Sequence, residues 1–397
     1  MRKRIKHSKR KGILAVMVRE FRRMSSSIIY ISLLIIFPLA CFFLFTEIFE
    51  NGVPHKLPIA AYDADGSSMS RKAIRMVEAT QSTQIAYRVT SYEEGKDLIL
   101  RGKCDALVII PNNFEKDILR GTPTTIPLYV SNVNILKGGL LDRDIRTALM
   151  TLNAGVNLQS RVKKGESPEQ ALAQVMPIVL EKKMLYNPFG NYAYYLLTAL
   201  LPIMLQMFIL TAAVYCINIE MKEGTAREWL QASGFDMISA VTGKMIPYTV
   251  VFFIMSLFMS TLLYRFVGVP LRGSRMILIL SNLFYVLAYQ GIGILIVSFT
   301  SNLRMGLSVS SLYAICAFTF SGLTFPFIGM PDALYYVGQL FPFTQYLDIY
   351  ISQGLRGAPL YTALLPLGLL GLFILVPLMF LPKLKVHMMY AKYWGKV

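Results

Sequence analysis

The sequence predicts an α-helical polytopic membrane protein with six transmembrane helices and an inserted extracytoplasmic α/β domain. Three observations support this fold class. Charged residues make up only 16% of the 397 residues, against roughly 25% in soluble chains. Six segments are long and apolar enough to cross a bilayer. The first two of them are separated by a long polar stretch with a strand and helix pattern.

Each predicted span approaches the roughly 20 mostly apolar residues that a membrane helix needs. The spans lie near residues 28–45, 192–219, 245–266, 276–299, 305–325 and 360–381. Buried helices of a large soluble protein are rarely so long and so uniformly uncharged. The first span resembles a signal peptide in following a basic stretch. It ends in TEIFENG, without a small-residue cleavage site, which favours an uncleaved anchor.

Basic residues at both chain ends predict the orientation. Residues 1–11 hold seven Lys or Arg and no acid, and the tail after Leu381 holds four lysines and no acid. The positive-inside rule therefore places both termini in the cytoplasm. The expected location of the chain is a cell (inner) membrane. Arg265, Arg272 and Arg275 then flank an outside loop, against this rule.

The net charge of +17 does not indicate nucleic-acid binding, because much of it lies beside the spans. There it orients the chain and attracts lipid headgroups, so the bilayer is the expected partner. A metal or redox site is not supported, because the cysteines and histidines are scattered. These are Cys41, Cys104, Cys216, Cys316, His7, His55 and His387.

The hydrophobic pattern predicts five consecutive regions. They are a basic tail with an amphipathic interfacial helix (1–26), a first span (27–48), an extracytoplasmic domain with a helical stalk (49–191), a five-helix region (192–382) and a cytoplasmic tail (383–397). In the amphipathic helix, Ile13, Leu14, Met17, Val18 and Phe21 form one side, and Arg19, Arg22 and Arg23 the other. The alternative is an inward extension of the first span.

The polar stretch reads as alternating strands and helices, which favours a small α/β sheet. Its predicted strands are LPIAAYD, TQIAYRVTS, CDALVIIP and TIPLYVSN, and Ser91 is placed to cap a helix. Asp63 and Asp65 stand beside Gly66, where carboxylates are usually turn residues. The sequence contains no phosphate loop or nucleophile elbow after a strand, so no catalytic residue is predicted.

Two motifs and the layout resemble the type-2 ABC transporter permease family, in its subgroup with a large extracytoplasmic domain after the first span. The first motif is IEMKEGTAREWLQASGFDMISAVTGKMIPY, between the second and third spans. Glu220, Glu223, Gly224 and Thr225 match the family's acidic-Gly-Thr element, and Gly243 and Lys244 its Gly-Lys pair. The resemblance implies a coupling helix (220–243) that docks on an ATPase, with Trp229 and Leu230 as its apolar contact. The alternative is an ordinary solvated loop.

The second motif covers residues 322–358. The pairs Phe325-Pro326, Met330-Pro331 and Phe341-Pro342 match the family's order. The resemblance implies two short re-entrant helices near an outer gate, and proline ends or kinks helices locally. Read without the resemblance, the segment is a surface loop with two amphipathic turns.

The chain lacks G-x-x-x-x-G-K-[ST], so it is not expected to bind ATP in that way or to be an enzyme. The resemblance implies a separate ABC ATPase subunit that binds ATP, a second permease and, in some systems, a periplasmic membrane-fusion adaptor. The implied function is ATP-driven export of a hydrophobic or amphipathic substrate. The alternative is a membrane-anchored scaffold or receptor. Among the few polar residues in the spans are Gln206, Asn282 and Gln290, read as function candidates or as helix-to-helix contacts.

Overall fold

The computed structural model describes residues 11–50, 52–176, 181, 183–187, 190–300, 302–390, 392 and 394. The predicted basic tail therefore lies almost entirely outside the described residues. The chain divides into a membrane unit (Met1–Gly52 and Met184–Val397) and an inserted domain (Val53–Lys183). The predicted fold class, a helical polytopic protein with a small sheet domain, is confirmed.

Among the described residues, five helical segments are long and apolar enough to cross a membrane. They are α2, η1 and α3 (Ile28–Ile48); α9 (Tyr192–Lys222); α11 and η2 (Met237–Phe266); α12 (Arg275–Phe299); and η5, α16, η6 and α17 (Leu360–Met389). The predicted fifth span is the shorter α13 (Leu303–Thr319). Its 17 residues rise about 26 Å, close to the roughly 30 Å of a hydrocarbon core.

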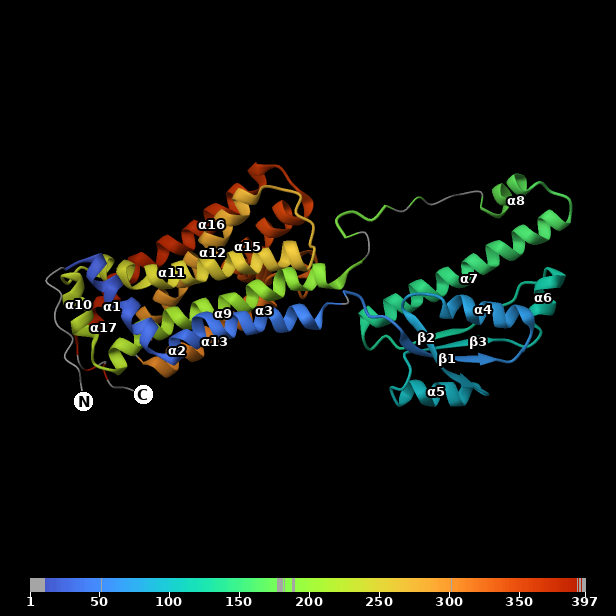
Figure 1. Cartoon of the computed structure of the whole chain (residues 1–397), viewed down its shortest axis with the longest axis horizontal. Helices are drawn as coiled ribbons and strands as arrows, with labels where there is room; N and C mark the ends of the chain where they lie inside the picture. Colours follow the sequence, from blue (N-terminus) through green and yellow to red (C-terminus); the bar gives the residue numbers. More distant parts are fainter. Residues whose placement is uncertain are drawn as a thin grey trace. The chain divides into compact units, whose positions relative to one another are not determined.

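The remaining helices of the membrane unit are short. They are α1 (Ile13–Ser26), α10 (Ala226–Ser233), η3 (Phe327–Gly329), α14 (Asp332–Gln339), α15 (Pro342–Ile349) and η4 (Tyr350–Arg356). Figure 1 shows α1, α10 and α17 gathered at one end of the unit, called here the coupling end. The opposite end, where α3 stops and α9 and α12 begin, is called the insertion end.

A break separates α1 from the first span. Ser27 has an extended backbone, with φ −122° and ψ 123°, between α1 and α2. The first span therefore does not continue inward as one helix, and that alternative is wrong.

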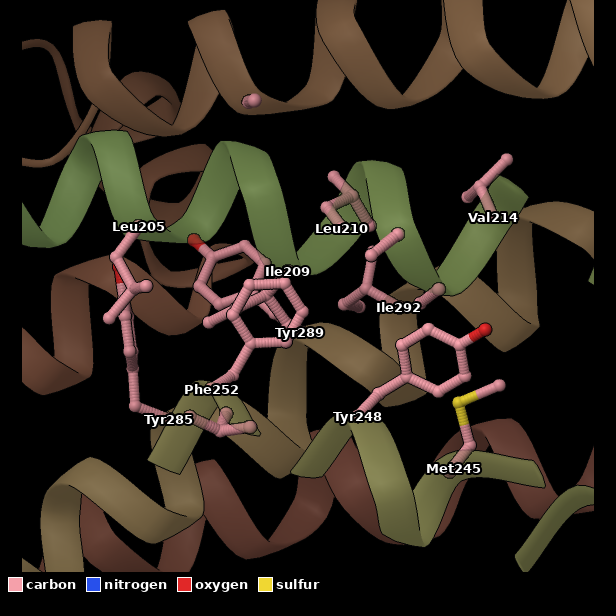
Figure 2. Packing of buried hydrophobic residues seen from close by; sticks show 14 of the residues in the cluster. Leu205, Ile209, Leu210, Val214, Met245, Tyr248, Phe252, Tyr285, Tyr289 and Ile292 are labelled. Carbon is pink, nitrogen blue, oxygen red and sulfur yellow. The ribbon is translucent and has the colours of Figure 1, made fainter. Parts of the chain in front are cut away.

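The core of the membrane unit centres on α9 and α12, which pack against each other. Figure 2 shows side chains of α9, α11 and α12 interdigitating, among them Ile209, Phe252 and Tyr289. Small residues allow close approach, as is usual between membrane helices. A Cβ added to Gly293 of α12 would lie 2.6 Å from the Cβ of Ala213 in α9.

The inserted domain is built on a four-stranded sheet of order β2-β1-β3-β4. Its strands are β1 (Leu57–Asp63), β2 (Thr83–Val89), β3 (Ala106–Ile110) and β4 (Leu128–Val130). The strand β1 runs parallel to β2 and β3, and β4 is antiparallel to β3. Alternation along β1 directs Ile59 into one core cluster and Ala60 into another.

Helices cover both faces of this sheet. On one face lie α4 (Ser68–Glu78) and α7 (Ile135–Lys163), and on the other α5 (Tyr92–Leu100). Two short helices, α6 (Phe114–Arg120) and α8 (Pro168–Val175), complete the domain. Ser91 caps α5 by accepting a hydrogen bond from the Glu94 amide, and Asp63 accepts one from the Gly66 amide within its turn.

Candidate functional site

Six charged side chains from three helices meet at the coupling end. Arg19, Glu20 and Arg23 come from α1, Glu220 and Glu223 from the end of α9, and Lys244 from α11. The Lys244 ammonium lies 2.8 Å from a carboxylate oxygen of Glu220 and 2.5 Å from one of Glu20. All three side chains are fully buried. Three acids and three bases balance, which is the condition for burying charge at tolerable cost.

Two of the three arginines of α1 complete the network. Arg19 donates to Glu220 at 2.9 Å and Arg23 donates to it at 2.9 Å, and Arg23 also pairs with Glu223. Burial lowers the pKa of the Arg19 guanidinium, but the hydrogen bond and charge of Glu220 outweigh it, so this pKa is raised overall. Both arginines therefore stay charged, and α1 is bound to α9 by ion pairs.

Glu20 is buried because it lies on the side of α1 that packs against the bundle. Val16, Glu20 and Met24 recur at four-residue spacing and are buried against the bundle. Glu20 also accepts a hydrogen bond at 2.7 Å from the Tyr248 hydroxyl. The apolar side of α1 faces outward, with Phe21 64% exposed. The sequence reading missed Glu20, although an acid on a buried stripe was visible in the spacing.

The acidic-Gly-Thr element forms a turn organised around Glu220. Gly224 ends α9 with a φ of +71°, a conformation that side chains rarely adopt. The Thr225 amide donates to the Glu220 carbonyl at 2.8 Å, and its hydroxyl donates to the Glu220 carboxylate. The spacing of the motif therefore stabilises the turn at the end of α9 through contacts within the chain. Glu223 is exposed at the surface.

Trp229 and Leu230 are fully buried. The Trp229 indole N–H donates to the Ala240 carbonyl at 3.2 Å, and its ring faces the Lys244 ammonium at 5.0 Å. The expectation that these residues present an apolar surface to an ATPase is thus wrong, because both are buried and Trp229 joins α10 to α11 instead. The exposed apolar side chains beside α10 are Phe235 (47%) and Ile238 (63%), which the sequence reading missed.

Gly243 permits the contact between α1 and α11. A Cβ at this position would lie 2.6 Å from the Ile13 carbonyl oxygen and 2.9 Å from the Val16 Cβ. The two residues of the Gly-Lys pair have different roles. Gly243 leaves room for α1, and Lys244 forms ion pairs with Glu20 and Glu220.

The family follows from comparison with known proteins. A family model described as ABC-2 family transporter protein matches residues 28–381. The chain belongs to the ABC-2 transporter family. It is accordingly a membrane permease of an ABC transporter. No curated protein matches the chain significantly.

The permease's second predicted motif folds into a 3₁₀ turn and two short helices, followed by η4. The 3₁₀ turn and α14 each begin after a proline, and α15 begins at Pro342. Its two halves differ in burial. Phe325, Pro326 and Pro331 are exposed and Met330 is half-buried, whereas Phe341 and Pro342 are buried.

The helix α15 is fixed in the bundle by hydrogen bonds to α12. The Tyr289 hydroxyl accepts from the Phe343 amide at 3.2 Å, and Tyr346 donates to Asn282 at 2.8 Å. The Phe343 amide at the start of α15 would otherwise be a buried donor without a partner, and the Tyr289 hydroxyl satisfies it.

The polar residues predicted in the spans connect helices. Gln206 donates to the Ala314 carbonyl at 3.2 Å, and Gln290 accepts from Thr249 at 2.7 Å. Asn282 donates to Ser260 at 2.9 Å besides its bond to Tyr346. Each therefore makes a hydrogen bond between helices, which is the second of the two roles that the sequence left open, function candidate or helix-to-helix contact.

Proposed function

We propose that this permease is the membrane subunit of an ATP-driven exporter that works with a separate ATPase subunit. The observation that supports this most is the coupling end. There α10 is joined to α11 through Trp229, and the buried ion network joins α9 and α11 to α1. A displacement of α10 by a partner would move three helices together, since packed elements shift as units.

The proposed docking surface is the exposed side of α10 and the turn after it. Arg227, Glu228 and Gln231 are exposed on the helix, and Phe235 and Ile238 follow. Such a mixture of apolar centre and charged rim is typical of protein interfaces. The buried residues behind it would hold this surface in place.

The substrate we propose is hydrophobic or amphipathic and moves outward. The spans carry charged residues only toward their ends. Their central parts contain none, and these parts are residues 28–45, 192–219, 245–264, 276–299, 305–319 and 360–381. A path lined by these helices offers no compensating charge to an ion, and burying an unpaired charge is costly.

The test replaces the exposed apolar pair. Phe235→Ser/Ile238→Ser should lower the ATPase retained on the purified permease by roughly tenfold, because apolar anchors dominate interfaces. Leu119→Ser, at a 76% exposed position of the inserted domain, is the control and should retain wild-type amounts. Equal ATPase retention by all three proteins would contradict docking at this surface.

A second permease is proposed to lie against α13. This short, apolar helix exposes Arg304, Ser308 and Ser311 beside apolar side chains that are also exposed, namely Met305, Leu312 and Ile315. Polar side chains facing lipid are unfavourable, whereas they hydrogen-bond readily between helices. An identical or paralogous permease would cover this face.

A further inference from the structure

The three arginines that oppose the predicted orientation lie together with a fourth at the insertion end. Arg265 is in the last turn of η2, Arg272 lies in the passage to α12, Arg275 is the first residue of α12, and Arg356 ends η4. Arg356 is remote in sequence from the other three, so its place beside them is a product of the fold.

Backbone contacts hold the segments against each other. The Arg272 amide donates to the Gly354 carbonyl at 3.0 Å, and a Cβ on Gly357 would lie 3.0 Å from the Arg272 Cβ. The rings of Tyr264 and Tyr350 stack at 5.9 Å between centroids. Four guanidinium groups are thus carried by one compact cluster of loops.

The charge of this cluster is not neutralised by the chain. All four arginines are exposed, and in the part of the chain that the structure describes none of them has an acidic ion-pair partner within 4.0 Å. The charge of Arg356 opposes the rise in the pKa of Asp348 that burial causes, but the two side chains form no ion pair within 4.0 Å. At the coupling end, by contrast, Arg19 and Arg23 of α1 pair with acidic side chains.

Large apolar side chains surround the arginines. Phe266 is 73% exposed, Met276 74% and Tyr361 72%. Arginine with exposed aromatic and aliphatic residues at a span end is the pattern of a bilayer interface. An acidic protein partner would match the charge but not these apolar groups. The planar guanidinium fork binds phosphate in two-point fashion.

We propose that Arg265, Arg272, Arg275 and Arg356 form a site for the phosphate groups of anionic phospholipids in the leaflet at the insertion end. The acyl chains would lie along Phe266 and Met276. Bound lipid would supply the negative charge that the chain lacks here, which explains how arginines persist on the side that the positive-inside rule disfavours.

The experiment titrates the full-length permease in neutral detergent with short-chain phosphatidylglycerol. Arg272→Gln/Arg356→Gln should bind it about 25-fold more weakly than wild type, since each of the two basic residues near an anionic surface contributes about fivefold. The control Arg75→Gln/Arg88→Gln removes the same charge from exposed arginines of the inserted domain and should bind as wild type. Lipid sites at the coupling end are common to both variants, so the difference in affinity between the two variants reports binding at the arginine cluster.

Further arms separate the possible ligands. A second variant, Arg265→Gln/Arg275→Gln, should show a similar loss, and phosphatidylcholine of equal chain length should bind all variants alike. Inorganic phosphate at matched concentration should leave phosphatidylglycerol bound. Equal phosphatidylglycerol affinity in the patch and control variants would overturn the proposal, as would displacement of the lipid by inorganic phosphate alone.

Discussion

Lys244 is the residue on which the coupling end depends most directly, because its ammonium is the buried counter-charge of two buried carboxylates. Lys244→Met should lower the free energy of unfolding by about 3–5 kcal/mol, since a broken buried ion pair leaves an uncompensated charge. Stability against SDS in mixed micelles measures this. The double variant Glu20→Gln/Lys244→Met should lose less than the sum of its single variants. Strict additivity would mean that the two groups do not interact.

Gly243 is a sharper test of geometry because it carries no charge. Gly243→Ala places a methyl group 2.6 Å from the Ile13 carbonyl, so α1 must shift, at a cost of about 1–3 kcal/mol. Limited proteolysis should then cut α1 faster than in wild type. Gly368→Ala in α16 is the matched control, because no atom lies within 4 Å of the added Cβ. Similar protection of α1 in both variants would refute close packing at Gly243.

Single residues also show which contacts could not be predicted from the sequence. Glu220 and Lys244 were visible as a motif, but their partners Glu20, Arg19 and Arg23 lie some 200 residues away along the chain. Pairing over that separation depends on tertiary structure, which hydrophobic periodicity does not encode. Trp229 was misplaced for the same reason, because its exposure is decided by where α11 packs.

Among the elements, α13 carries a direct prediction about assembly. In a variant with Cys41 and Cys316 replaced by serine, Ser311→Cys should cross-link two permeases in the membrane if its exposed polar face meets a second copy. The control Val250→Cys, at a 53% exposed position of α11, should remain monomeric on a denaturing gel. Cross-linking at both positions to the same extent would indicate random collision.

The elements differ in how far the sequence revealed them. The long spans were predictable because about 20 apolar residues need no knowledge of neighbours. The fifth span was predicted to continue to residue 325, but α13 ends at Thr319. Gly322, shortly after this end, has a φ of +81°. The sheet order β2-β1-β3-β4 was not predictable, because alternation identifies strands but not their neighbours.

At the scale of the whole molecule, the inserted domain has the attributes of an independent folding unit. Its two apolar clusters lie on opposite faces of one sheet, and both are built from residues of the domain alone. A core enclosed within one compact unit can form without its neighbours. Residues 53–183, expressed alone, should therefore give a soluble protein that unfolds cooperatively on heating, as followed by circular dichroism. Leu107→Asp, a charge in the fully buried cluster under α5, should abolish that transition. A gradual, non-cooperative loss of signal in the unsubstituted domain would show that its fold requires the membrane unit.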